Sequence, residues 1–134
     1  PTTNNPPPPP ARDGGMTADE LELFDMIDAA RVRNGCAPLE QDPNLTGGAR
    51  AEAEDRAESG AVNSYTDSKT AAGGDNWSAQ QAFDQMMAQK KSVVLNCNLK
   101  TLGVGMDDAR YKACMLGPVL CTTRTRVAWV ADFT

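Results

Sequence analysis

A change in hydrophobic pattern at Leu95–Gly105 constrains the fold of this chain more than any other feature of its sequence. Before this stretch, apolar residues recur at helical spacing. After it, short apolar runs are separated by turn residues, which is typical of strands. The runs cover Thr101–Asp107, Ala109–Leu116 and Arg124–Phe133. We therefore expect a helical half followed by a sheet, with Leu95–Gly105 as the junction between the layers.

Two glycines, Gly103 and Gly105, lie within the first predicted strand. A glycine in a strand allows either a positive φ or the close approach of a neighbouring element, because it has no Cβ. The Asp107-Asp108 pair and Gly117-Pro118 follow, and we expect the chain to turn at both. The predicted sheet is an antiparallel meander. Its last strand is apolar on both faces and should therefore be central or covered on both sides.

Three helices are predicted from N-cap residues and from apolar spacing. The caps are Thr17, Asp42 and Ser78. The helices run from Ala18 to about Arg33, from Pro43 to about Ser59, and from Ala79 to about Lys90 or Lys91. In the second helix the apolar stripe is almost entirely alanine, which indicates that its neighbour approaches closely. The predicted fold class is α+β, an α-β-α sandwich with three main helices on a small antiparallel sheet.

Two segments lack a periodic pattern. Residues 60–76 are polar and contain glycine, so we expect a long loop there with at most a short helix, and long loops in compact domains are often functional. Residues 1–15 contain Pro6–Pro10 and are predicted to form an extended, proline-rich spacer of the polyproline II type. Such a spacer often follows a membrane or wall anchor, and the alternative is a proline-rich ligand for a partner. The remaining residues, 16–134, form one predicted domain.

The charge and the residue types present exclude several functions. The formal net charge of −5 and the pI near 4.6 argue against binding to nucleic acid and, for the same reason, against a role at an acidic membrane surface. Histidine is absent, which removes the commonest metal ligand and the commonest general base. We therefore expect no cofactor and no metal. The predicted affinity for zinc, copper or calcium is no better than about millimolar.

The four cysteines contain no Cys-x-x-Cys pair, so two structural disulfides fit them better than a zinc site. We predict that Cys36 pairs with Cys97 and that Cys114 pairs with Cys121, although the other two connectivities remain open on sequence alone. Disulfides imply an oxidising compartment, and the sequence contains no apolar span of about 20 residues. The expected location is extracellular or in the cell envelope.

Several motifs occur in the order found in one known family. They are Asp28-x-x-Arg31-x-x-x-Gly35-x-x-Pro-Leu39, Asp42-Pro-x-Leu45-x-x-x-Ala49, Gly74-Asp75-Asn76, Leu95-Asn96 with Leu102-Gly-Val-Gly105, and Trp129-Val-Ala-Asp-Phe133. Over about Leu21 to Phe133 the chain resembles the CAP superfamily, also called the SCP domain. This superfamily comprises the cysteine-rich secretory proteins, antigen 5 and the pathogenesis-related 1 proteins. The resemblance implies an α-β-α sandwich in a secreted protein.

The resemblance also implies a cleft, in which family members place two histidines and two acidic residues that can hold a divalent metal. Here Ser64 or Tyr65 falls near the first histidine, Asp75 replaces the glutamate, and Lys90 or Lys91 falls at the second histidine. A lysine ammonium has no lone pair and repels a metal ion. The candidate degenerate cleft therefore consists of Ser64, Tyr65, Asp75, Asn76 and Lys90, without a metal and without catalytic residues.

The predicted function is a non-catalytic, secreted or surface-exposed CAP-like binding module for a lipid or another small apolar ligand, acting as a monomer. The alternative is an extracellular sensor or protein-interaction domain of a membrane-anchored receptor, such as a bacterial envelope sensor kinase. A Ser–Lys hydrolase built on Ser64 and Lys90 is the third hypothesis. A lipid carrier needs an apolar pocket or groove, whereas an interaction module needs exposed apolar residues on its loops.

Overall fold

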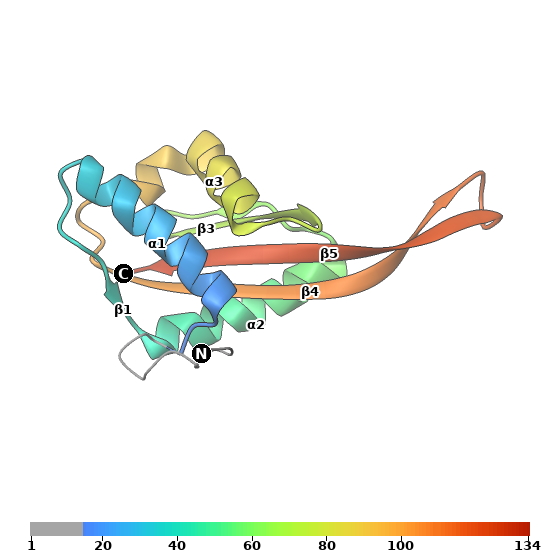
Figure 1. Cartoon of the computed structure of the whole chain (residues 1–134), viewed down its shortest axis with the longest axis horizontal. Helices are drawn as coiled ribbons and strands as arrows, with labels where there is room; N and C mark the ends of the chain where they lie inside the picture. Colours follow the sequence, from blue (N-terminus) through green and yellow to red (C-terminus); the bar gives the residue numbers. More distant parts are fainter. Residues whose placement is uncertain (1–14) are drawn as a thin grey trace.

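The computed structural model describes residues 15–134, and over this range it has three helices and a five-stranded sheet (Figure 1). The predicted spacer over residues 1–15 lies outside the described residues except for Gly15. The elements are α1 (Ala18–Arg33), β1 (Glu40–Gln41), α2 (Pro43–Ser59), β2 (Ser64–Tyr65), β3 (Lys69–Asp75), α3 (Ala79–Val94), β4 (Thr101–Met115) and β5 (Leu120–Phe133). The predicted α+β class is confirmed.

All three helices begin at the predicted caps. The Thr17 hydroxyl accepts the N–H of Glu20, whose carboxylate accepts the N–H of Thr17, so α1 starts with a complete capping box. The first two helices also end where predicted. The third is longer than predicted, because α3 continues past a kink at Lys90, which has φ −148° and ψ 58°, to Val94. Val93 and Val94 at its end are buried in the core, and this packing favours the continued helix.

The prediction of a loop over residues 60–76 is wrong, because this segment contains β2 and β3. The strand order is β1-β4-β5-β3-β2, so β3 lies inside the sheet and pairs antiparallel with β5 along its whole length. Its residues, Lys-Thr-Ala-Ala-Gly-Gly-Asp, are not strong strand formers. Pairing with β5 and burial between helical layers, rather than intrinsic preference, place this segment in the sheet.

The predicted turn at Asp107-Asp108 is also wrong, because β4 runs through both residues without a break. Asp107 is half-buried and Asp108 is exposed, so the strand carries both carboxylates without the cost of fully burying a charge. The chain turns once in this region, at 116–119. The sheet is therefore not a simple meander, and β1 pairs with β4 in parallel while the other pairs are antiparallel.

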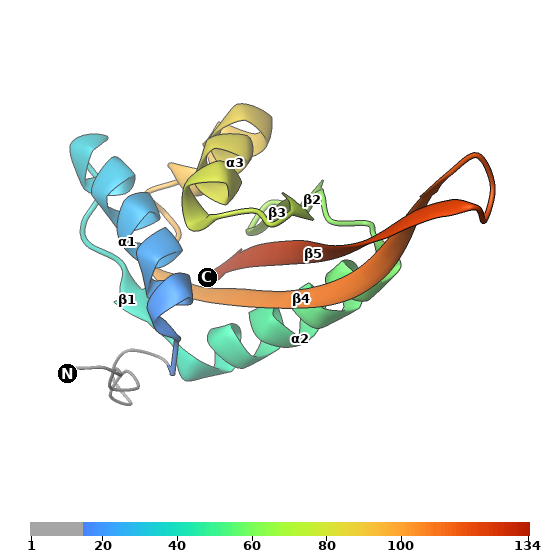
Figure 2. The same cartoon turned by 45° about the vertical axis from the view of Figure 1, so that its right-hand side comes forward.

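The sheet lies between two helical layers, as predicted. In Figures 1 and 2, α2 covers one face while α1 and α3 lie side by side on the other. The larger core fills the α1–α3 side and the smaller one, mainly alanine, fills the α2 side. β5 lies in the middle of the sheet and is buried from Val127 to Ala131, which confirms that the last strand is central.

The close approach predicted from Gly103 and Gly105 occurs between β4 and α2. A Cβ at Gly103 would lie 2.2 Å from the backbone nitrogen of Thr46, and one at Gly105 would lie 2.2 Å from that of Arg50. Neither glycine has a positive φ. On the same helix, the fully buried Ala53 belongs to the alanine core between α2 and the sheet. The two glycines are therefore needed for the spacing between the helix and the strand.

Buried Glu20 joins three elements. Its carboxylate accepts hydrogen bonds from the guanidinium of Arg50 on α2 and, at 2.9 Å, from the N–H of Met106 on β4. Only 1% of the residue is exposed. A buried carboxylate needs such partners, and here they fix the start of α1 against the helix on the other side of the sheet.

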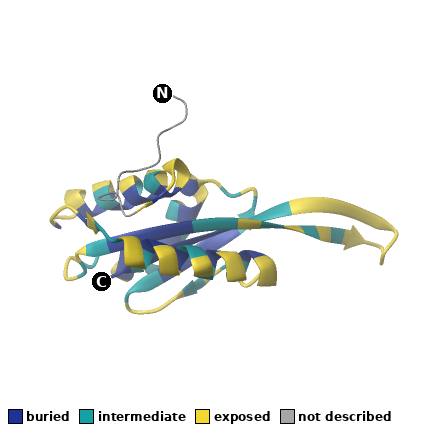
Figure 3. Ribbon diagram, turned by 90° about the horizontal axis from the view of Figure 1, so that it is seen from below, coloured by how far each residue is buried: buried dark blue, intermediate teal, exposed yellow. Residues whose placement is uncertain are grey.

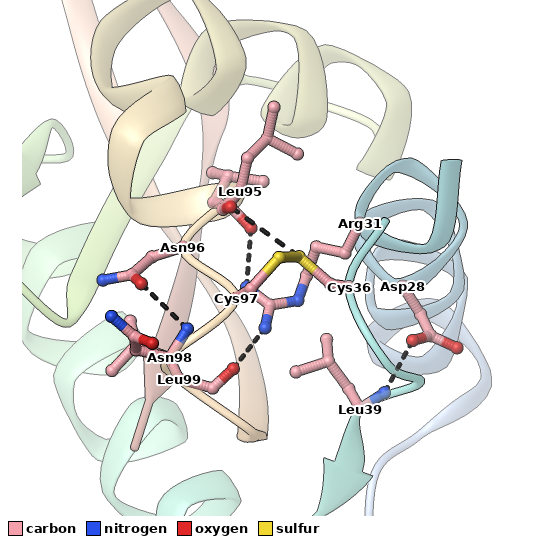
Figure 4. The surroundings of a disulfide bond; sticks show 10 residues. Asp28, Arg31, Cys36, Leu39, Leu95, Asn96, Cys97, Asn98 and Leu99 are labelled. Atoms are coloured by element: carbon pink, nitrogen blue, oxygen red, sulfur yellow. Dashed lines mark hydrogen bonds between the residues drawn. A yellow bond between two sulfur atoms is a disulfide. The ribbon is translucent and has the colours of Figure 1, made fainter. Parts of the chain in front are cut away.

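The disulfide between Cys36 and Cys97 ties the end of α1 to the segment before β4 (Figure 4). Beside it, the buried side chain of Arg31 donates to the carbonyl oxygens of Val94 and Leu99. These bonds satisfy carbonyl groups at the end of α3 and in the loop after it. The predicted pairing of these two cysteines is thus present in the structure.

Part of the sheet extends beyond the three packed layers of helices and strands, which we call the body. β4 and β5 continue together beyond the helices as a two-stranded arm, defined here as residues 109–126, which is largely exposed (Figure 3). Near its end, Cys114 and Cys121 form the other predicted disulfide. None of the helices described over residues 15–134 has the length and apolar character needed to cross a membrane.

We predict opposite effects for two glycine substitutions. Gly105→Ala should lower the free energy of unfolding by about 2–3 kcal/mol, because the new methyl group meets the backbone of α2. Gly47→Ala is the matched control. Gly47 is exposed on α2 with no atom within 4 Å of its Cβ position, so this change should raise the free energy of unfolding by about 0.5–1 kcal/mol. Urea denaturation followed by circular dichroism measures both, and equal effects would contradict the close approach.

Candidate functional site

The structure brings together two of the predicted cleft residues. Tyr65 lies on the edge strand β2, and the ammonium of Lys90, at the kink of α3, lies 5.0 Å from the centre of its ring. This is a cation–π contact between a half-exposed tyrosine and a lysine. Ser64 is the other residue of β2 and pairs with Ala71. Lys90, predicted at the position of the second histidine, thus contacts the ring of Tyr65, predicted near the first.

Asp75 and Asn76, the other two candidate cleft residues, lie at the C-terminal end of β3. Tyr65 pairs with Thr70, and Asp75 follows Thr70 by five residues, so about 17 Å of strand separates the two positions. Asn76 comes next, in a turn with φ 55°. Tyr65 and Asp75 therefore lie beside opposite ends of β3.

Asn76 lines a surface pocket of about 290 Å³ between the sheet and the N-terminal ends of α1 and α3. Partly exposed Trp77 and almost fully buried Trp129 line it, and the indole N–H of Trp129 donates to the carbonyl oxygen of Trp77. Two exposed carboxylates, Asp19 and Glu22, lie at its edge. The other lining residues are Ser78, Ala79, Met106 and Val127.

One polar residue of the pocket, Ser78, already takes part in a helix cap. The hydroxyl of Ser78 accepts the N–H of Gln81 as the cap of α3, so this serine has a structural role. Over residues 15–134, no three cysteine, aspartate or glutamate side chains are close enough together to hold a metal ion. The arrangement can bind a small, partly aromatic ligand by stacking and hydrogen bonding.

Asp75 takes part in a different cluster, at the base of the arm. The Tyr111 hydroxyl donates to Asp75 at 2.5 Å, and the Arg124 guanidinium lies 3.3 Å from the other carboxylate oxygen. Arg126 stacks 4.1 Å from the centre of the Tyr111 ring and donates to the carbonyl oxygen of Ala57 at the end of α2. We call Asp75, Tyr111, Arg124 and Arg126 the latch, because they join the arm to β3 and α2.

The latch alters the acidity of two of its members. The hydrogen bond from Tyr111, followed by the nearby Arg124, lowers the pKa of Asp75 below its ordinary value. The same hydrogen bond raises the pKa of the Tyr111 hydroxyl, since an adjacent carboxylate disfavours a phenolate. Asp75 is thus held as a carboxylate by its partners on the arm. Asp75, a candidate cleft residue from the sequence, has these contacts at the base of the arm.

The end of the arm carries an apolar surface that was not expected from the sequence. We call residues Met115–Leu120 the tip. The exposed fractions of Met115, Leu116, Val119 and Leu120 are 70%, 80%, 76% and 55%. Together with the disulfide, three of these side chains border a hollow of about 300 Å³. Nothing among the described residues covers this surface.

A signal for the tip was present in the sequence. The Cys114–Cys121 pair sets the hairpin register, which places Met115 opposite Leu120 and Tyr111 opposite Arg124. With one turn at Gly117-Pro118 instead of two, the same residues predict a long ribbon with apolar residues at its end.

We predict that the pKa of Asp75 depends on Tyr111. In the native protein it should lie below the ordinary value of about 3.9, and Tyr111→Phe should move it upward. Because the folded pKa is lowered, the stability from this carboxylate is present above the ordinary pKa and is lost as pH falls through the folded pKa. Carbon-13 NMR titration of the carboxyl group measures the shift. An unchanged pKa in the variant would show that the hydrogen bond is absent in solution.

No protein-family model and no curated protein matches the sequence. Solved structures do match. MpPR-1i, a pathogenesis-related 1 protein, has a TM-score of 0.63 at 12% identity, with 88% of this chain and 89% of that chain covered. An outer surface protein from Borrelia burgdorferi has a TM-score of 0.52 at 12% identity, with 89% and 96% covered. At this identity the likeness concerns the fold alone, and the chain has the fold of the CAP superfamily.

Proposed function

We propose that the protein is an exported, non-catalytic binding module of the CAP type that recognises its partner through the apolar tip of the arm. One observation carries this proposal. Among the described residues, six large apolar side chains are exposed, and four of them lie at the tip. Single exposed apolar residues are common, but a cluster of them marks an interaction site.

The arm is held in a fixed shape, which supports a binding role. The disulfide closes its end, and the latch fixes its base through Asp75 and Ala57. A preorganised surface loses less conformational entropy on binding than a mobile loop of the same composition. The two disulfides also support export, because such bonds persist in oxidising compartments.

The state of the predicted cleft residues supports a function without catalysis. Lys90 stacks on Tyr65, and Asp75 is bound to Tyr111 and Arg124. A serine nucleophile needs a base within hydrogen-bond reach, and with histidine absent from the sequence only a lysine could serve Ser64. Lys90 already interacts with the tyrosine ring next to Ser64. This contact argues against the Ser–Lys hydrolase.

A second candidate function is the binding of a small ligand in the pocket beside Asn76. The partly exposed ring of Trp77 favours it. The volume of about 290 Å³ is at the lower limit for ligand pockets, which hold about 300–1,000 Å³. A sterol or a long acyl chain therefore fits poorly, and a small aromatic or polar compound fits better.

The two candidates make different predictions for soluble ligands. If the tip is the binding site, we expect monomeric fatty acids, short-chain phospholipids and sterols to leave the melting temperature unchanged. We also expect no turnover of ester or peptide substrates. A ligand at about 100 times its dissociation constant would stabilise the native state by about 2.7 kcal/mol, which is readily detected. A shift abolished by Trp77→Ala would favour the pocket over the tip. Turnover lost on Ser64→Ala would contradict a non-catalytic function.

A further inference from the structure

The arm differs in charge from the rest of the molecule. It carries Arg110, Lys112, Arg124 and Arg126, and the sequence has no acidic residue from Ala109 to Ala131. The whole chain has a formal net charge of −5, so the negative charge is concentrated elsewhere. Arg124 is partly neutralised by Asp75, whereas Arg110 and Lys112 are exposed. The net charge of the whole chain, from which the sequence disfavours an acidic membrane surface, therefore does not describe the arm, which is basic and has an apolar end.

Three of the basic residues lie behind the tip, three to five positions along the two strands from Met115. Lys112 precedes Met115 by three residues, which is about 10 Å along a strand. Arg110 and Arg124 lie one or two residues further back in the same register. Apolar segments that bind membrane surfaces enter the interface to a depth of about 5–10 Å. With Met115 at this depth, Lys112 lies at the level of the lipid headgroups.

We infer that the tip inserts into the surface of a membrane rich in anionic lipid, with Lys112, Arg110 and Arg124 against the headgroup phosphates. This inference rests on the proposed function and names its partner. The apolar side chains supply insertion, and the cations supply attraction to negative charge. The acidic body, which a negative surface repels, is kept at a distance by the length of the arm (Figures 1 and 3).

The same observations disfavour a protein partner. A stable protein complex buries about 800 Å² on each side, and energetically dominant interface residues are usually tryptophan, tyrosine or arginine. The tip offers a few aliphatic side chains on a narrow ribbon and no aromatic residue. A second copy would bring arms of the same charge together. A bilayer requires neither a complementary shape nor a large contact area.

Vesicle sedimentation with the full chain tests the inference. The probes are vesicles of phosphatidylcholine alone and vesicles with about 30% phosphatidylglycerol, each at low and at physiological salt. We expect binding to the anionic vesicles only, weaker at higher salt. The double variant Leu116→Ser, Val119→Ser should lose at least about ten-fold in affinity, because its side chains insert. The double variant Arg110→Gln, Lys112→Gln should lose about ten-fold or more and should show a smaller dependence on salt.

The controls make the same chemical changes outside the arm. Val32→Ser and Arg33→Gln replace an exposed valine and an exposed arginine at the end of α1, and vesicle binding should not change. All four tip and arm positions are exposed, so the variants should fold, which circular dichroism verifies.

Three results would overturn the inference: no binding to anionic vesicles, equal binding to neutral vesicles, or unchanged binding by the tip variant. A dimer that the tip variant dissociates, seen by size-exclusion chromatography without vesicle binding, would assign the tip to a second copy. None of these vesicle or dimer results would contradict the proposal that the protein is a non-catalytic binding module. That proposal fails instead if hydrolytic turnover or a ligand in the Trp77 pocket is found.

Discussion

The contact between α2 and β4 at Gly103 and Gly105 is the constraint on which the rest of the structure depends. A side chain at either position would lie 2.2 Å from the helix backbone, so the two elements fit together only with glycine. This spacing allows the alanine stripe of α2 to pack on the sheet. It also brings Arg50 within reach of Glu20, which fixes α1 on the opposite side. The close approach and the Glu20–Arg50 pair together hold helices against both faces of the sheet.

The same contact extends to the arm. Because α2 is held along β4, its C-terminal end lies beside the place where β4 and β5 leave the body, and the carbonyl oxygen of Ala57 accepts a hydrogen bond from Arg126. Asp75, at the end of β3, adds its bonds to Tyr111 and Arg124. The arm thus continues the sheet instead of forming a loose loop. Recognition by its tip uses the body as a support.

Local sequence signals predicted the helices well, since capping residues and apolar spacing act within a few residues of each other. They failed where a segment forms a strand only because it pairs with a strand distant in the sequence. The segment Lys69–Asp75 consists of weak strand formers and becomes a strand only because β5 and the helical layers cover it. The partners of Asp75 depend on the hairpin register, which the misplaced turn at Asp107-Asp108 obscured. The candidate site was therefore less predictable than the fold.

We propose that binding takes place at the tip of the arm and not at the candidate cleft residues or the pocket beside Asn76. Amide hydrogen exchange of the full chain, with and without anionic vesicles, tests this directly because it reports on both regions at once. We expect anionic vesicles to slow amide exchange at residues 115–120 and to leave it unchanged at 64–65 and 76–79. Slower exchange at the latter segments, with an unaffected tip, would contradict it.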